Sequence, residues 1–204
     1  KSRKALFIFI NMSINMNLAN ELQINFSEYK FKIEHNKKSS LLYSEDKKCR
    51  YYYYYKLKNL KINKKVTVIM INPSESDFHI ENETPDNTIN NLYNIINNKF
   101  NEISAFEVLN LYPLINSKFD GVINQDICRL NLAIIEYVIQ KANIVIPAWG
   151  VEKKYNRDMT NIIKEIKNMC KTKEVKIIVN KFPCHFSVQC TSLNRNPELV
   201  TYNF

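Results

Sequence analysis

From residue 66 onward the chain alternates between two hydrophobic patterns. Continuous apolar runs of about six residues are typical of strands that are covered on both faces, and apolar residues every three or four positions are typical of helices. The predicted strands span residues 66–71, 104–111, 144–148 and 175–179. The predicted helices span residues 86–100, 127–142 and 155–170. This order predicts an α/β fold with a central four-stranded parallel sheet flanked by helices.

The first third of the chain has a less regular pattern. A helix is predicted around residues 17–29, a loop over 36–48, and a strand where five tyrosines follow Arg50, because tyrosine favours strands. A length of 204 residues suits one substantial core. We therefore expect residues 1–48 to form an N-terminal extension, packed on or preceding the core, and residues 49–204 to form the α/β domain.

The apolar run near the N-terminus resembles a signal peptide only superficially. The run from Ala5 to Ile10 is short, Asn11 interrupts it, and no small-x-small cleavage site follows. No stretch of the sequence reaches the length of a transmembrane helix. The expectation is a soluble, cytoplasmic protein.

Composition excludes several classes of protein. With only two glycines, the chain has no glycine-rich phosphate loop, which excludes P-loop ATPases and Rossmann dehydrogenases. The five cysteines are scattered without a C-x-x-C pair, and Cys184, His185 and Cys190 lack the second close pair of a zinc site. No metal or other cofactor is expected. A net charge of +9 favours a polyanionic partner such as DNA.

Polar and aromatic residues follow each predicted strand. Asn72, Asn110 and Trp149 come directly after apolar runs, and His185 follows the last one. In parallel sheets, ligands bind beyond the carboxyl ends of the strands. An amide offers a donor and an acceptor, which matches the edge of a pyrimidine, and a histidine can stabilise a developing negative charge. The alternative for each of these residues is ordinary turn or packing chemistry.

Six short motifs occur in a recognisable order. They are Arg50-Tyr51, Ile71-Asn72-Pro73-Ser74, Asp86-Asn87-Thr88-Ile89, Asn110-Leu111, Ala148-Trp149-Gly150 and Pro183-Cys184-His185. Their order over residues 50 to 190 resembles an uncharacterised family of bacterial and phage proteins that carries only a domain-of-unknown-function label. The chain departs from the family pattern at Asn87, Leu132 and Phe186.

The same positions more distantly resemble the uracil-DNA glycosylases. That resemblance implies that Asn72 positions the attacking water, that Asn110 reads the edge of a flipped base, and that His185 stabilises the departing base. Asp86 is a second candidate for handling the water, although it would equally serve as a helix N-cap. The resemblance also implies further contacts to the base, from Ser74, Phe78, Tyr112 and Trp149.

The loop after Asn72 lacks the early aromatic residue with which uracil-specific enzymes exclude larger pyrimidines, since Phe78 comes later. A modified base is therefore expected. Basic residues around the tyrosine run are expected to contact the DNA backbone: Arg50, Lys56 and Lys58.

The predicted function is a monofunctional DNA glycosylase that acts on a modified or damaged pyrimidine, with modified phage DNA as one target. Two alternatives remain open: a module that binds nucleic acid or a modified base without cleaving it, and an enzyme that acts on free nucleotides.

Overall fold

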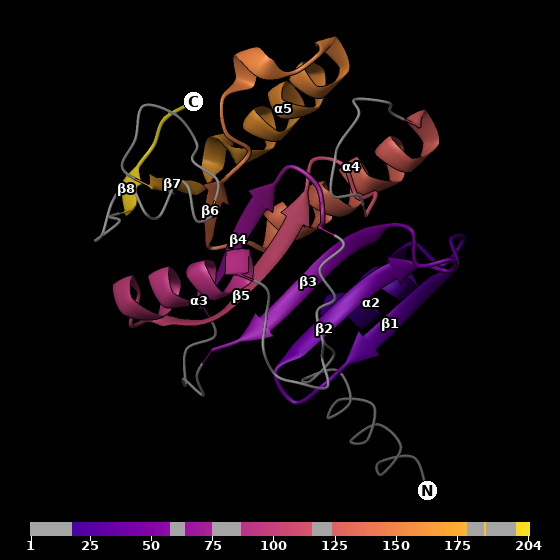
Figure 1. Ribbon diagram of the computed structural model, residues 1–204, viewed down its shortest axis with the longest axis horizontal. Coiled ribbons are helices and arrows are strands. Elements are labelled where there is room, and N and C mark those ends of the chain that lie inside the picture. The colour runs from indigo at the N-terminus through magenta and orange to yellow at the C-terminus, as the bar shows by residue number, and fades with distance from the viewer. Residues whose placement is uncertain (1–17, 58–63, 75–86, 116–123, 179–185, 187–198) are drawn as a thin grey trace, which may run out of the picture.

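The computed structural model describes residues 18–57, 64–74, 87–115, 124–178, 186 and 199–204. These residues form one eight-stranded sheet in the order β1-β2-β3-β5-β4-β6-β7-β8 (Figure 1). The strands are β1 (Phe31–His35), β2 (Ser39–Ser44), β3 (Arg50–Lys56), β4 (Lys64–Met70), β5 (Ile103–Asn110), β6 (Ile144–Pro147), β7 (Glu174–Ile178) and β8 (Leu199–Thr201).

The predicted four-stranded parallel sheet is wrong as a description of the core, although the α/β class is right. Strands β5, β4, β6 and β7 do run parallel to one another. However, β3 pairs antiparallel with β5 on one side, β8 pairs antiparallel with β7 on the other, and β1 and β2 extend the sheet beyond β3. The apolar runs identified the parallel strands, but nothing in them indicated that antiparallel strands would join the same sheet on both sides.

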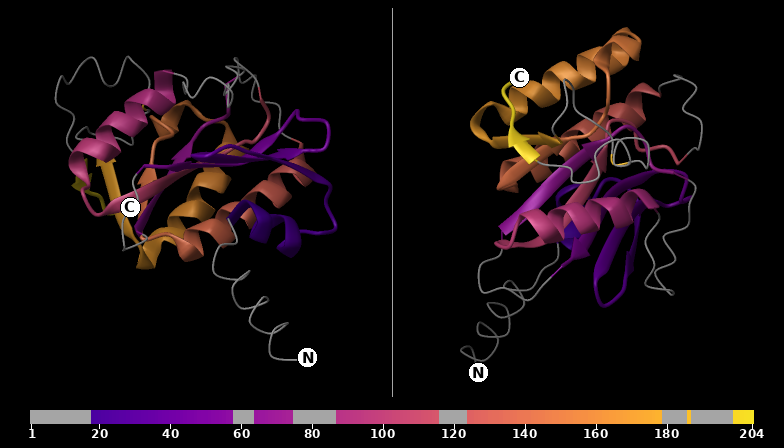
Figure 2. Two further views of the ribbon diagram at one scale, coloured as in Figure 1. Left: turned by 90° about the horizontal axis from the view of Figure 1, so that it is seen from below. Right: turned by 60° about the vertical axis from the view of Figure 1, so that its left-hand side comes forward.

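Helices cover both faces of the sheet unequally. The four α-helices of the described residues are α2 (Leu18–Asn25), α3 (Asn87–Lys99), α4 (Gln125–Lys141) and α5 (Arg157–Met169). Helix α3 lies on one face, and α2, α4 and α5 lie on the other (Figure 2, left). We call these the α3 face and the α4 face. Short 3₁₀ turns, Glu152–Lys154 and Cys170–Thr172, flank α5.

The helix boundaries follow from capping and from apolar stripes. Asn124 caps α4 by accepting hydrogen bonds from the backbone N–H groups of Asp126 and Ile127, and Asn156 caps α5 in the same way through Met159. Helix α3 buries Ile89, Leu92, Ile95 and Ile96 against the sheet, which is the spacing that predicted a helix here.

The predicted loop over residues 36–48 is wrong, because Ser39–Ser44 forms the buried strand β2. Asn36 turns the chain between β1 and β2 by accepting hydrogen bonds from the backbone N–H groups of Lys38 and Ser39, at 2.7 and 2.6 Å. Leu41 and Leu42 are fully buried, one on each face. Residues from both sides of the predicted boundary at 48/49 therefore share one sheet.

Strand β3 places its tyrosines on both faces. Tyr51 and Tyr52 belong to the core of the α4 face, and Tyr53 belongs to the core of the α3 face. All three are at most 4% exposed. The tyrosine run is therefore a buried strand and not a surface on which bases could stack. Among the described residues, no helix is long and apolar enough to cross a membrane.

Candidate functional site

The chain segments that leave β5, β4 and β6 are hydrogen-bonded side by side. The backbone N–H groups of Leu111 and Tyr112 donate to the carbonyls of Met70 and Ile71, both at 2.9 Å, and the N–H of Ala148 donates to the carbonyl of Ile69 at 2.7 Å. The fold thus brings the segments that begin with Asn110, Asn72 and Trp149 to one edge of the sheet, which we call the carboxyl edge.

Asn110 points towards the α3 face of the sheet. Its neighbour Val108 lies in the core of that face, whereas Leu109 and Leu111 lie in the core of the α4 face, and successive side chains of a strand alternate. Asn110 is 3% exposed. Its side-chain amide offers both a donor and an acceptor, which suits it to bind a polar ligand at this edge.

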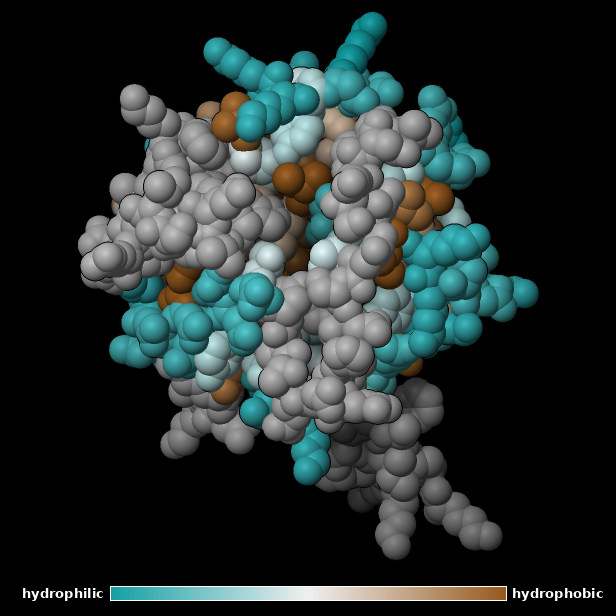
Figure 3. Space-filling model, in the orientation of Figure 1, coloured by the Kyte–Doolittle hydropathy of each residue, from teal (hydrophilic) through white to brown (hydrophobic). Residues whose placement is uncertain are grey.

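Asn72 and Ser74 follow β4 at the same edge and are half-buried. The Asn72 side chain donates a hydrogen bond from Nδ2 to the carbonyl oxygen of Pro73 at 3.3 Å. Hydrophobic residues are visible near the middle of the face of the molecule that Figure 3 shows.

Trp149 lies on the opposite, α4 face and is fully buried. Its indole N–H donates to Glu152 at 3.3 Å, its ring stacks on Phe204 with centroids 6.1 Å apart, and its carbonyl accepts a hydrogen bond from the Tyr155 hydroxyl. These contacts hold the turn at Gly150, whose φ is +83°. The structure therefore does not bring the Trp149 ring to the face towards which Asn110 points.

Tyr112 is buried, with 3% of its surface exposed, and its hydroxyl accepts a hydrogen bond from the backbone N–H of Asn124 at 3.3 Å. Because Asn124 is the N-cap of α4, this bond links the end of β5 to the start of the helix.

The basic residues predicted to contact the DNA backbone lie in different places. Arg50 lies at the carboxyl edge, since its backbone N–H donates to the carbonyl of Pro113 at 2.8 Å. The residue is only 6% exposed. Lys56 is exposed at the other end of β3, opposite Ala105, near the start of β5. Six residue steps at about 3.3 Å each separate the two, roughly 20 Å. Arg50 is thus buried near the site, and Lys56 is exposed far from it.

Tyr43 is a residue of this edge that the sequence did not single out. It lies directly opposite Arg50 across β2 and β3, so both side chains point to the α3 face. Burial raises the pKa of the Tyr43 hydroxyl, and the positive charge of Arg50 opposes that rise. No sequence signal marked Tyr43, because its strand read as a loop.

Four predicted site residues lie outside the described residues: His185, Asp86, Phe78 and Lys58. Phe186, which follows His185 in the sequence, is described and fully buried in the core of the α3 face. Its carbonyl accepts a hydrogen bond from Asn91 Nδ2 of α3 at 3.2 Å. Phe186 was noted only as a departure from the family pattern, and its large apolar side chain explains its place in the core.

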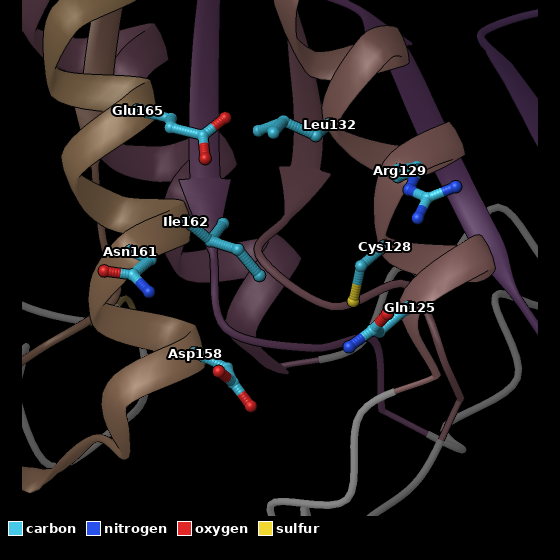
Figure 4. Close-up of a pocket in the computed structure, with 8 residues that line it drawn as sticks. All are labelled: Gln125, Cys128, Arg129, Leu132, Asp158, Asn161, Ile162 and Glu165. Carbon is cyan, nitrogen blue, oxygen red and sulfur yellow. The ribbon is translucent and has the colours of Figure 1, made fainter.

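A separate groove of about 250 Å³ lies between α4 and α5 (Figure 4). Its lining residues are Gln125, Cys128, Arg129, Leu132, Asp158, Asn161, Ile162 and Glu165. Burial, and then the carboxylate of Asp158, raise the pKa of the Cys128 thiol to about 11. The thiol is therefore protonated at neutral pH and is a poor nucleophile.

Among the described residues, no group of three or more histidine, cysteine, aspartate or glutamate side chains could hold a metal ion. The residues with metal-ligand chemistry in the sequence, Cys184, His185 and Cys190, lie outside the described residues.

The chain matches a family of known sequences but no individual known protein. No curated protein and no solved structure matches the chain. A family model described as a protein of unknown function (DUF1643) matches residues 50–186. This span runs from the first residue of β3 to Phe186 and includes all six motifs, which confirms the resemblance to a domain-of-unknown-function family. The chain therefore belongs to the DUF1643 family of proteins of unknown function.

Proposed function

We propose that the protein is a DNA glycosylase that hydrolyses the N-glycosidic bond of a flipped, modified or damaged pyrimidine and leaves an abasic site. The observation that carries the proposal is the position of the Asn110 amide, which lies at the carboxyl edge on the α3 face, on the strand next to the one that Asn72 follows. An amide that can both donate and accept matches the adjacent oxygen and N–H group of a pyrimidine edge.

The proposed reaction needs a held water molecule and a stabilised leaving group. The water oxygen attacks C1′ of the sugar, the bond from C1′ to the base nitrogen breaks, and the electron pair leaves with the base. In this proposal, Asn72 holds the water through its side-chain oxygen. His185, which lies outside the described residues, donates a hydrogen bond to the oxygen of the departing base. One proton of the water is released, and the base anion takes up a proton.

Three further observations support this arrangement. Asn72 follows β4, and Asn110 ends the adjacent parallel strand β5. His185 is next in sequence to Phe186, which is buried on the face towards which Asn110 points. The net charge of +9 suits a polyanionic substrate. A mismatched or damaged base also suits the proposal, because flipping a base out of a duplex costs a few kcal/mol and costs least for such a base.

A base-binding module without cleavage is the second candidate, and the chemistry of Asn72 favours it. A carboxamide can position water but cannot remove a proton from it, so the site has a weaker general base than a carboxylate would provide.

Oligonucleotides with one defined base test the proposal. Single- and double-stranded DNA carrying uracil, 5-hydroxymethylcytosine or glucosylated 5-hydroxymethylcytosine is incubated with the protein, and abasic sites are detected by alkaline cleavage. We expect cleavage at one of these bases, and we expect Asn110→Ala and Asn72→Ala each to lower kcat/KM by about 10²-fold or more. The exposed Asn168 of α5 provides a matched control, and Asn168→Ala should retain full activity.

Two results would decide against the enzyme. Selective binding of one base without abasic sites in any substrate would establish the binding module instead. Equal binding of modified and unmodified DNA without cleavage would contradict both candidates.

A further inference from the structure

Asn131 is a polar residue in the buried stripe of α4. It is 1% exposed, and its helix neighbours on the same side, including Leu130, Ile134 and Ile135, belong to the core of the α4 face. A buried amide in an apolar helix face requires partners, because its desolvation is otherwise uncompensated.

The partners of Asn131 are two consecutive backbone carbonyls at the end of β5. Its Nδ2 donates hydrogen bonds to the carbonyl oxygen of Asn110 at 2.8 Å and to that of Leu111 at 3.1 Å. Both amide protons are therefore used at the point where β5 ends. The N–H groups of Leu111 and Tyr112 are in turn bonded to β4, so α4 and β4 hold this strand end from two sides.

Asn131 and the Asn110 side chain lie on opposite faces of the sheet. Asn131 belongs to α4, which covers the α4 face, and Asn110 points to the α3 face. Asn131 therefore does not reach a ligand that is bound by the Asn110 amide. It acts on that amide only through the backbone that carries it.

We infer that Asn131 is a positioning residue for Asn110, in that it fixes the end of β5 and thereby aims the Asn110 amide at the substrate. This inference rests on the proposed function. The Oδ1 atom of Asn131 is buried without a hydrogen-bond partner in the described part of the chain, which opposes stability. Stability alone therefore does not account for an amide at this position, whereas the two aligned carbonyls do.

A small displacement of the strand end has a large catalytic consequence. Misplacement of a substrate-binding group by about 1 Å can lower a rate by about 10²-fold. The loss is expected in kcat more than in KM, because a misaimed amide still contacts the base but no longer holds it in the reactive orientation.

Two variants separate positioning from folding. Asn131→Leu has a similar volume and removes both donors. Asn131→Asp keeps the shape and leaves at most one donor, so it serves if the leucine variant does not fold. Asn168→Leu on the exposed side of α5 is the matched control.

The first measurement is hydrogen exchange at the Leu111 and Tyr112 amides, at a temperature well below the unfolding midpoint of each variant. We expect exchange to accelerate about 10-fold or more in both Asn131 variants and to stay unchanged in the control. Unchanged exchange in a folded Asn131 variant would overturn the inference. This measurement needs no substrate, so it decides whether Asn131 anchors the strand end even if the wild-type protein excises no base and the proposed function fails.

The second measurement is the kinetics on the base that the wild-type protein excises. A fall in kcat of about 10²-fold, with KM changed less than about threefold, is expected for Asn131→Leu at equal folded fraction. A variant could show faster exchange at the Leu111 and Tyr112 amides and still have the wild-type kcat. This result would show that Asn131 does not aim the Asn110 amide, and it would also overturn the inference.

Discussion

The ammonium group of Lys65 lies 2.6 Å from the carboxylate of Glu107 in the middle of the sheet, where the Glu107 side chain is fully buried. The same carboxylate accepts hydrogen bonds from the hydroxyls of Tyr52 at 2.9 Å and Thr67 at 3.0 Å. Three strands, β3, β4 and β5, therefore share one buried charged group. These contacts explain why the fully buried strand β5 carries a glutamate.

Removing the lysine should destabilise the fold. In Lys65→Met the carboxylate of Glu107 stays buried without its counter-charge, and we expect a loss of about 3–5 kcal/mol in the free energy of unfolding, measured with urea. The double variant Lys65→Met/Glu107→Gln should recover most of this loss. No recovery would mean that the lysine acts through packing alone.

Trp149 should not respond to DNA. It is the only tryptophan of the chain, so intrinsic fluorescence reports on this residue alone. Because Trp149 is fully buried on the α4 face, we expect weak quenching by acrylamide and little change in emission when DNA binds. Strong quenching by bound DNA would instead support the contact between Trp149 and the base that the sequence predicted.

Substitution of Gly150 should cost stability for a conformational reason. Its φ of +83° is unfavourable for residues with a side chain, whereas the one atom of the described residues that an added Cβ would meet is the Tyr155 hydroxyl oxygen, at 3.9 Å. We expect Gly150→Ala to lower the free energy of unfolding by about 1–2 kcal/mol, and Gly150→Asn by less, because asparagine tolerates positive φ. Equal losses in the two variants would point to a steric cause.

Alkaline pH should weaken the fold through Cys170. Burial raises the pKa of its thiol from 9.0 to about 12, and Lys173 opposes that rise. Between pH 9 and about 12 the folded state therefore keeps the thiol proton that the unfolded state has lost. The contribution of Cys170 to the free energy of unfolding is complete below pH 9 and declines as the pH rises from 9 to 12. A plot of the urea midpoint against pH over this range should be flatter for Cys170→Ala than for the wild type.

Lys56 should contribute little to DNA binding at the proposed site, because it lies at the end of β3 that is far from the carboxyl edge. We expect Lys56→Ala to change the Kd for the preferred oligonucleotide by less than about twofold at 0.15 M salt. A loss of tenfold would mean that the DNA runs across the other edge of the sheet.

The sequence predicted what depends on local patterns. The positions of α3, α4 and α5 and of the four parallel strands follow from apolar periodicity, and their shared direction brought Asn72 and Asn110 to one edge. It did not predict β2, because six residues between lysine-rich turns carry too weak a pattern, although Leu41 and Leu42 were a usable signal.

The face on which each candidate side chain lies was not predictable either. Asn110 ends β5 and Trp149 comes two residues after β6, and the apolar runs before them did not indicate that the two side chains lie on opposite faces of the sheet. Asn131 offered a signal that was not used: an amide within an apolar helical stripe must find buried partners, and backbone carbonyls at the end of a buried strand can supply them.

Strand β3 has a practical consequence for expression of the family domain by itself. A fragment limited to residues 50–186 would begin at β3 and lack β1 and β2, which pair with it in the full sheet. The free side of a tyrosine-rich strand would then present unpaired backbone groups to solvent, and such exposed strands recruit other chains and aggregate. A fragment that starts at or before residue 18 keeps this strand covered, and is the appropriate length for producing a soluble sample.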